Sequence, residues 1–320
     1  MTAVEKALVS PRNLSAGEMS ARLRSEDAGL WREAFAAARE VKVRCGKAEV
    51  LPRGLVECSN VCAKNCLYCG IRRGNAGAAR YRLTEEEARA CVDEAVRRGY
   101  PAVAFQAGEV EGEANTAYYE RLTAYAVEKG LEVTLSLGEQ ADEVYRRWKA
   151  AGAMRYLIRI ETSNRELYAK IHPADCSFER RVGCIRALKR LGYVTGTGVM
   201  IGLPGQTEDN LARDIVFYGD ERADMVGMGP YVPNAETPLG KGVVGVRSRA
   251  LDDACKMIAL TRLYLWDANI VAATALEALD PACGRQRGID AGANVIMPNL
   301  TPDRYRASYD LYPGKTERRD

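Results

Sequence analysis

Short apolar runs alternate along the chain with longer segments of helical periodicity. The apolar runs predict strands at residues 55–59, 102–106, 132–137, 156–161, 195–201, 225–229, 270–274 and 294–297. The intervening segments predict helices at residues 84–98, 116–129, 139–150, 178–191, 207–221, 247–266 and 281–291. Strands that alternate with long helices indicate right-handed crossovers and a parallel sheet. The pattern therefore predicts an α/β protein with a TIM-type (β/α)8 barrel.

Residues that favour helix ends support these elements. Thr84, followed by Glu87, and Ser177 are typical N-caps. Glycines that suit the left-handed end of a helix stand one to three residues before apolar runs, at Gly99, Gly130, Gly152, Gly192 and Gly292. We expect residues 1–50 to form an N-terminal helical extension and residues 51–320 a single barrel domain, in which residues 298–320 form a tail over the barrel mouth.

The composition excludes several classes of protein. The 320 residues are 47% hydrophobic and 28% charged, which is typical of a globular protein. The net charge of +3 is too small to favour nucleic-acid binding. The sequence contains no run of 18 apolar residues and no signal-peptide pattern. We therefore expect a cytoplasmic protein that binds neither nucleic acid nor membrane.

The chain has one histidine, His172, and ten cysteines. A single histidine excludes metal sites built on two or more histidines, so metal binding would have to use thiolates. Three cysteines, Cys62, Cys66 and Cys69, have the spacing CxxxCxxC directly after the first predicted strand. In a parallel barrel this is the end at which active sites form.

Three thiolates on one loop can bind three irons of a 4Fe-4S cluster and leave the fourth iron without a protein ligand. A zinc clip or an electron-transfer cluster would usually need a fourth ligand, which Cys58 could supply. Cys58 lies on the apolar run, however, where a cysteine is commonly a buried hydrophobe. A non-catalytic iron-sulfur or zinc protein is thus the alternative from a different class.

The cysteine loop resembles that of the radical S-adenosylmethionine (SAM) enzymes, since Tyr68 precedes the third cysteine. In that family the open iron binds SAM, and an electron from the cluster cleaves SAM to give methionine and a 5'-deoxyadenosyl radical. The resemblance implies a radical SAM barrel, with a 4Fe-4S cluster and SAM as cofactors and an electron donor as partner.

The sequence is also similar to one subgroup, the HydE-type maturases of FeFe-hydrogenase. The shared segments are SNVCAKNCLYCG at 59–70, TLSLGE at 134–139, GLPGQT at 202–207, NVIMPN at 294–299 and YPGK at 312–315. The subgroup acts on a small iron complex that carries CO, cyanide and cysteine. The resemblance therefore implies such a small-molecule substrate and other hydrogenase maturases as partners.

The resemblance also assigns roles to individual residues. Besides the cluster ligands Cys62, Cys66 and Cys69, SAM would contact Tyr68, Gln106, Gly108, Ser136, Glu161, Arg181 and Ile201. Substrate would contact Arg159, Thr134, Met225, Thr274, Met297 and Tyr312.

Several residues depart from the subgroup pattern. Ile160 replaces a histidine, Ala107 replaces a serine, and Ala273 replaces one threonine of a pair. These changes favour, as an alternative, a related enzyme with another small substrate, such as a methylornithine-synthase-like mutase. No cysteine follows Cys283, so we expect no auxiliary C-terminal cluster. We expect His172 at the surface or in a loop rather than at the cavity rim, and Cys45, Cys91, Cys176, Cys184 and Cys255 outside the site.

Overall fold

The computed structural model describes residues 1–243 and 249–315. Its strands are β1 (Leu51–Pro52), β2 (Gly54–Ser59), β3 (Ala102–Ala107), β4 (Glu132–Ser136), β5 (Arg155–Leu157), β6 (Val194–Thr197), β7 (Met200–Ile201), β8 (Met225–Val226), β9 (Gly229–Pro230), β10 (Asn269–Ile270) and β11 (Val295–Ile296). Its helices are α1 (Ala3–Val9), α2 (Ala16–Arg24), α3 (Ala28–Arg44), α4 (Glu85–Arg97), α5 (Glu113–Glu128), α6 (Asp142–Ala150), α7 (Arg165–Ile171), α8 (Phe178–Arg190), α9 (Glu208–Asp220), α10 (Ala250–Tyr264), α11 (Thr274–Leu279), α12 (Gly284–Ala291) and α13 (Asp303–Arg306).

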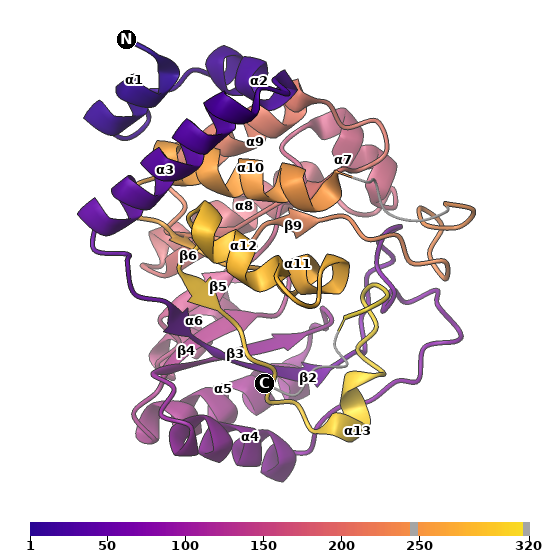
Figure 1. Cartoon of the computed structure of the whole chain (residues 1–320). Coiled ribbons are helices and arrows are strands. Elements are labelled where there is room, and N and C mark those ends of the chain that lie inside the picture. Colours follow the sequence, from indigo (N-terminus) through magenta and orange to yellow (C-terminus); the bar gives the residue numbers. More distant parts are fainter. Residues whose placement is uncertain (244–248, 316–320) are drawn as a thin grey trace.

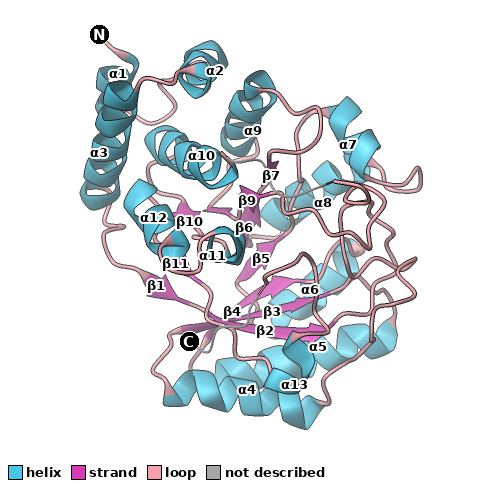
Figure 2. Ribbon diagram, turned by 45° about the vertical axis from the view of Figure 1, so that its right-hand side comes forward, coloured by secondary structure: helices cyan, strands magenta, loops and turns pink. Residues whose placement is uncertain are grey.

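The strands form a curved parallel sheet with helices on its outer face (Figures 1 and 2). Seven strands lie in the order β10-β8-β6-β5-β4-β3-β2, and every pair is parallel. The short strand β11 pairs with β1, and parallel bridges join Val295 to Val271 and Asn299 to Leu55. These bridges link the two edges of the sheet and complete the ring. The predicted TIM-type α/β fold is confirmed.

Two of the predicted strands are each divided in two. Residues 195–201 form β6 and β7, and residues 225–229 end in β9 after an interruption. The interruptions lie where Gly198 and Gly227 approach closely, since a Cβ on Gly198 would lie 2.0 Å from the Gly227 carbonyl oxygen. Glycine permits this close approach of two backbones.

Other predicted boundaries were also wrong. The strand predicted at 156–161 ends at Leu157, and Thr274, predicted to end a strand, begins α11. Helix α5 begins three residues before its predicted start and α6 begins three residues after it. Helices α7, α11 and α13 were not predicted. Residues 247 and 248 of the helix predicted at 247–266 lie outside the described residues.

The N-terminal residues are helical, as predicted, and cover one side of the barrel (Figure 1). Helix α2 packs against α9, and α3 packs against α10. The buried face of α3, which includes Trp31 and Val41, belongs to the same apolar core as the barrel helices. These helices therefore cover the outside of the barrel and take no part in the cavity described below.

No helix among residues 1–243 and 249–315 combines the length and the apolar character needed to cross a lipid bilayer.

Candidate active site

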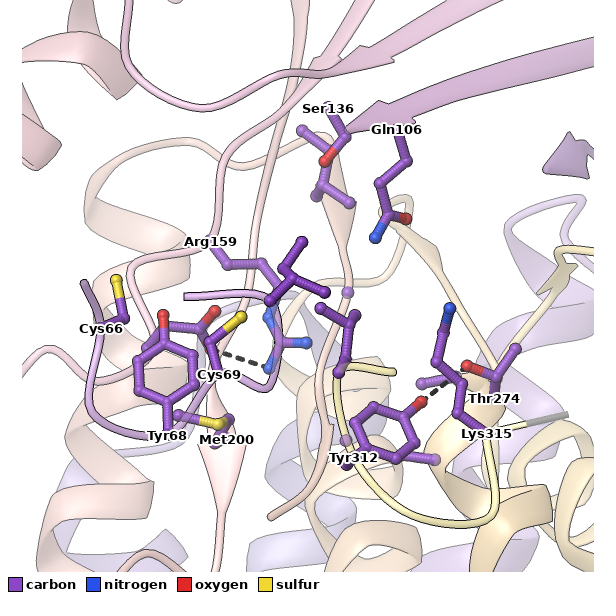
Figure 3. A pocket seen from close by; sticks show the side chains of 18 of the residues that line it. Cys66, Tyr68, Cys69, Gln106, Ser136, Arg159, Met200, Thr274, Tyr312 and Lys315 are labelled. Carbon is purple, nitrogen blue, oxygen red and sulfur yellow. Dashed lines mark hydrogen bonds and ion pairs between the residues drawn. The ribbon is translucent and has the colours of Figure 1, made fainter. Parts of the chain in front are cut away.

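A cavity of about 290 Å³ opens where the strands end, and the cysteine loop forms one side of it (Figure 3). Most of the residues predicted for the site line this cavity: Cys62, Cys66, Tyr68, Cys69, Gln106, Gly108, Ser136, Arg159, Glu161, Arg181, Thr274, Met297 and Tyr312. Cys66, Tyr68 and Cys69 lie opposite Thr274, Tyr312 and Lys315, and Gln106 and Ser136 lie at the ends of β3 and β4 (Figure 3). The fold thus brings predicted site residues from segments far apart in the chain to one cavity.

The three thiols of the loop share a sheltered environment. Burial raises the pKa of Cys62 and raises the pKa of Cys69 to about 12. The backbone N–H of Glu109 donates a hydrogen bond to Cys62 Sγ at 3.3 Å. Such thiols hold their protons until a metal displaces them, because binding requires the thiolate. Within the described ranges, no three Cys, His, Asp or Glu side chains converge on a single metal ion.

Backbone contacts fix the cysteine loop on several sides. Ala63 N–H donates to the Glu109 carbonyl oxygen at 2.7 Å, and Gly70 N–H donates to that of Leu311 at 3.1 Å. Gly108 lies so close to the loop that a Cβ there would be 2.3 Å from the Val61 carbonyl oxygen. The loop is therefore positioned by β3 and by the C-terminal tail.

A buried ion-pair network connects the loop to Arg181. Glu139, which is 1% exposed, accepts from Arg181 Nε at 2.6 Å and lies 3.4 Å from Lys64 Nζ in the loop. Lys64 also lies 3.1 Å from Glu109 Oε1. The cations Arg181 and Lys64 hold the pKa of Glu139 below its usual value despite its burial. Arg181 is thus oriented at the cavity wall by an anionic partner behind it.

Glu161 occupies an unusual backbone conformation at the cavity. Its φ of 67° lies in the left-handed region, and backbone bonds to Gly198 and from Met200 hold it there. Its Oε2 lies 2.9 Å from Arg159, and Tyr68 hydrogen-bonds to the same carboxylate. Burial raises the pKa of Glu161, and Arg159 opposes that shift. Strained conformations of this kind cluster at functional sites.

The tail forms the opposite side of the cavity. Thr274 Oγ1 and Tyr312 OH share a hydrogen bond of 2.8 Å (Figure 3). Lys315 lines the cavity and forms a buried ion pair with Glu57 of β2. Lys315 and Lys64 were not predicted as site residues, although both belong to the segments shared with the maturases. A lysine inside a shared motif was the signal that could have identified them.

Three predicted site residues do not line the cavity. Thr134 on β4, Met225 on β8 and Ile201 on β7 are buried within the barrel. Ile201 is fully buried, and its carbonyl oxygen accepts from Tyr231 N–H at 2.8 Å. Their roles remain predictions.

His172 lies in the loop after α7 and does not line the cavity, as predicted, but it is buried and not at the surface. His172 is 3% exposed, stacks on Tyr168 and lies 3.4 Å from Tyr68 OH. Burial, helped by the positive charge of Arg181, lowers the pKa of His172 to about 4. The neutral ring therefore supports Tyr68 from behind the cysteine loop.

Two of the cysteines outside the motif differ in their relation to the site. Cys58 is fully buried in β2 and does not line the cavity, as its apolar context predicted. Cys176, expected to be a bystander, is buried and does not line the cavity. The proximity of Cys176 raises the pKa of Cys66, and that of Cys66 lowers the pKa of Cys176.

The three departures from the maturase pattern lie in different places. Ala107 and Ala273 line the cavity. Ile160 is fully buried and is not part of its lining. Of these three residues, the two alanines therefore present methyl groups at the cavity surface.

Comparisons with known proteins agree with this site. The family model of the radical SAM superfamily matches residues 56–217. The chain is 45% identical over 293 residues to the FeFe-hydrogenase maturase subunit HydE of Thermotoga maritima, covering 90% of this chain and 81% of that protein.

Two solved structures share the fold. Methylornithine synthase has a TM-score of 0.84 and 23% identity, over 99% of this chain and 92% of that one. The maturase HydG of Carboxydothermus hydrogenoformans has a TM-score of 0.83 and 21% identity, over 99% and 74%. With its cysteine loop at the mouth of a parallel barrel and its likeness to HydE over most of its length, this chain belongs to the radical SAM superfamily of enzymes, and within it to the HydE family.

Proposed function

We propose that this enzyme acts in the maturation of FeFe-hydrogenase, on a small iron complex held inside the barrel. The observation that carries this proposal is the 45% identity to HydE in a chain whose three loop cysteines line one cavity. The family implies a 4Fe-4S cluster and SAM.

The residues present fit a cluster with one open iron. Cys62, Cys66 and Cys69 offer three thiols to the cavity, and among the described residues no further cysteine lines it. Cys58 is enclosed in β2 and cannot reach the cavity without breaking the strand. Together, cluster and SAM would supply the one-electron cleavage that gives a 5'-deoxyadenosyl radical.

The SAM site that we propose lies between the cysteine loop and Arg181. The guanidinium of Arg181 suits the SAM carboxylate, and Glu161 suits the ribose hydroxyls. Ser136 and Gln106 present polar side chains at the strand ends, and Gly108 allows close approach to the loop. Tyr68 would contact the adenosyl group, and buried Ile201 would support this region through the backbone.

The substrate would occupy the side of the cavity near the tail. Arg159, Thr274, Met297 and Tyr312 line that space, with Thr134 and Met225 in the layer behind. An arginine and two hydroxyl groups suit a small anionic complex that carries cyanide and a cysteine carboxylate. An electron donor would reduce the cluster, and other maturases would act in the same maturation. We expect no auxiliary C-terminal cluster.

One observation favours a second candidate, a methylornithine-synthase-like mutase. Ala107 and Ala273 remove polar groups from the cavity wall, and a buried polar ligand would then lack partners. A carbon-based substrate would be less affected by this loss.

The test is anaerobic reconstitution with iron and sulfide, followed by reduction in the presence of SAM. We expect 5'-deoxyadenosine and an adenosylated product only when the iron-cysteine complex is supplied. Cys66→Ala should lose the cluster and the activity, whereas Cys283→Ala, at an exposed position, should keep both. Cleavage of SAM that is indifferent to the iron complex would contradict the maturase assignment and favour the mutase. One zinc per chain without cleavage would contradict both.

A further inference from the structure

The segment that carries the cysteine loop is basic throughout. Residues 58–84 contain five basic residues, Lys64, Arg72, Arg73, Arg80 and Arg82, and no Asp or Glu. This segment alone therefore contributes +5 to a chain whose net charge is +3. Lys64 pairs with two carboxylates inside the protein, and Arg82 hydrogen-bonds with Asn115 of α5. The other three arginines have a different environment.

Arg72 and Arg73 are attached directly to the cysteine loop. Arg72 N–H donates to the carbonyl oxygen of the predicted cluster ligand Cys69 at 3.1 Å. Arg73 N–H donates at 2.8 Å to the carbonyl oxygen of Lys64, which lies between the first two cysteines of the motif. These two arginines thus have fixed positions beside the motif.

Arg80 joins the two ends of the same loop. Its guanidinium donates to the carbonyl oxygens of Asn60 at 2.7 Å and Ile71 at 2.8 Å, which lie on either side of the three cysteines. It also donates to the Arg72 carbonyl oxygen at 2.6 Å. The three arginines therefore lie together on one compact part of the chain.

The charges of these arginines are not neutralised by the protein. Within residues 1–243 and 249–315, no carboxylate forms an ion pair with Arg72, Arg73 or Arg80. Arg73 and Arg80 are exposed and Arg72 is half-buried. Residues 74–79 between them are glycine, asparagine and alanine, whose side chains are short. The segment lies at the outer edge of the molecule, on the right in Figure 1, where a partner can reach it.

We propose that Arg72, Arg73 and Arg80 form the docking surface for an acidic protein that carries one electron to the cluster. The inference rests on the proposed function, which needs an electron from outside the chain. The carrier loses one electron and the cluster gains it, and no bond or proton is transferred. Complementary charge speeds the association of two proteins. Electron-transfer encounters have small interfaces, so three charges are a large part of the contact.

The test uses a small acidic [2Fe-2S] ferredoxin as the probe and the anaerobically reconstituted enzyme without SAM. Calorimetric titration gives the dissociation constant of the oxidised ferredoxin, and freeze-quench electron paramagnetic resonance gives the rate at which the reduced ferredoxin reduces the cluster. We expect Arg73→Glu to weaken binding and slow reduction about tenfold at low salt. Added sodium chloride should shrink this difference, because it screens exposed charges.

Arg32→Glu is the matched control, because Arg32 is an exposed arginine on α3, which takes no part in the cavity. It should bind and accept electrons like the wild type. Iron content should be equal in all three proteins, and excess dithionite should reduce their clusters to the same extent. A loss confined to the ferredoxin then belongs to docking and not to the cluster.

Equal binding and equal reduction rates in wild type, Arg73→Glu and Arg32→Glu would overturn the inference. If Arg73→Glu contains less iron than the wild type, Arg73→Gln and the salt dependence of the wild type decide. A wild-type rate that does not fall with sodium chloride would then overturn the inference. A wild-type chain in which dithionite reduces no cluster would instead contradict the proposed function, and the inference with it.

Discussion

Arg181 is held at the cavity wall before any ligand binds, because its Nε–H donates a hydrogen bond to the carboxylate of Glu139 behind it. Arg181→Lys keeps the charge but loses the planar fork that binds a carboxylate with two parallel bonds. We expect the dissociation constant for SAM to rise about tenfold to a hundredfold, consistent with the ~1.5 to 3 kcal/mol of a charged hydrogen bond.

Equilibrium dialysis of labelled SAM against the reconstituted protein measures this change in affinity. Arg186→Lys on the same helix is the control, because Arg186 is 62% exposed in its side chain and pairs with Glu221. An unchanged affinity in Arg181→Lys would exclude Arg181 from the SAM site.

Asp214 makes the stability of the protein depend on pH. Its Oδ1 accepts from the N–H and hydroxyl of Ser163, two residues after Glu161. Burial raises the pKa of Asp214 from 3.8 to about 7. Between these values the folded carboxyl keeps its proton while the unfolded one has lost it. The free energy of unfolding contributed by this group therefore falls as pH rises from about 4 to about 7, by up to ~4 kcal/mol.

Asp214→Asn should remove this contribution, because an amide keeps the acceptor oxygen and does not titrate. Urea unfolding at several pH values should show the wild type losing stability relative to Asp214→Asn as pH rises. Asp209→Asn, at an exposed position on the same helix, should keep the wild-type slope. Parallel pH profiles for wild type and Asp214→Asn would contradict the role of this carboxyl.

At the scale of elements, the end of β3 can approach the cysteine loop closely because residue 108 is a glycine. Gly108→Ala would place a methyl group 2.3 Å from the Val61 carbonyl oxygen, so that the loop has to move. We expect less than half the wild-type iron content after reconstitution and a lower melting temperature. Gly183→Ala, on α8 with open space around its Cβ position, should retain its iron and melt at or above the wild-type temperature.

The ends of helices were predictable because their signals are local. Thr84 and Glu87 form the expected capping box, and Ser177 caps α8 as expected. Gly99 and Gly130 end helices in the left-handed conformation, where a side chain would be strained. Each of these features depends on residues within one helical turn, which a sequence pattern contains.

The ends of strands and the fit of the loop were not predictable in this way. The division between β6 and β7 lies where Gly198 contacts Gly227. No local sequence pattern around either glycine indicates that the two will meet. Thr274 follows an apolar run, but its backbone begins α11 and its hydroxyl meets Tyr312 from the tail. The cysteine loop follows the first long strand, as the motif predicted, whereas the pairing of Lys315 with Glu57 depends on packing between distant segments.

At the scale of the whole molecule, the tail is joined to the barrel by a charge pair inside it. Lys315 pairs with Glu57, which is fully buried in β2 and also accepts from Asn299 Nδ2 at 3.1 Å. Lys315→Met would leave a buried carboxylate without its cation, at a cost of about 3 to 5 kcal/mol. Chemical denaturation measures this loss.

The double variant Glu57→Gln with Lys315→Met removes both charges, so its loss should be smaller than that of Lys315→Met alone. Lys241→Met, at an exposed position outside the barrel, should leave the free energy of unfolding unchanged. A double variant as unstable as Lys315→Met would show that the ion pair does not hold the tail.

The seam of the ring joins residues from opposite ends of the sequence, since Leu51 pairs with Val295 and Leu55 with Asn299. On a ribosome, the first partners must wait until almost the whole chain has been synthesised. The ring consequently cannot close along that seam until the residues around 295–299 have been synthesised, when the other strands are already available to pair. Closure of the barrel is therefore a late step that joins the last strand to the first.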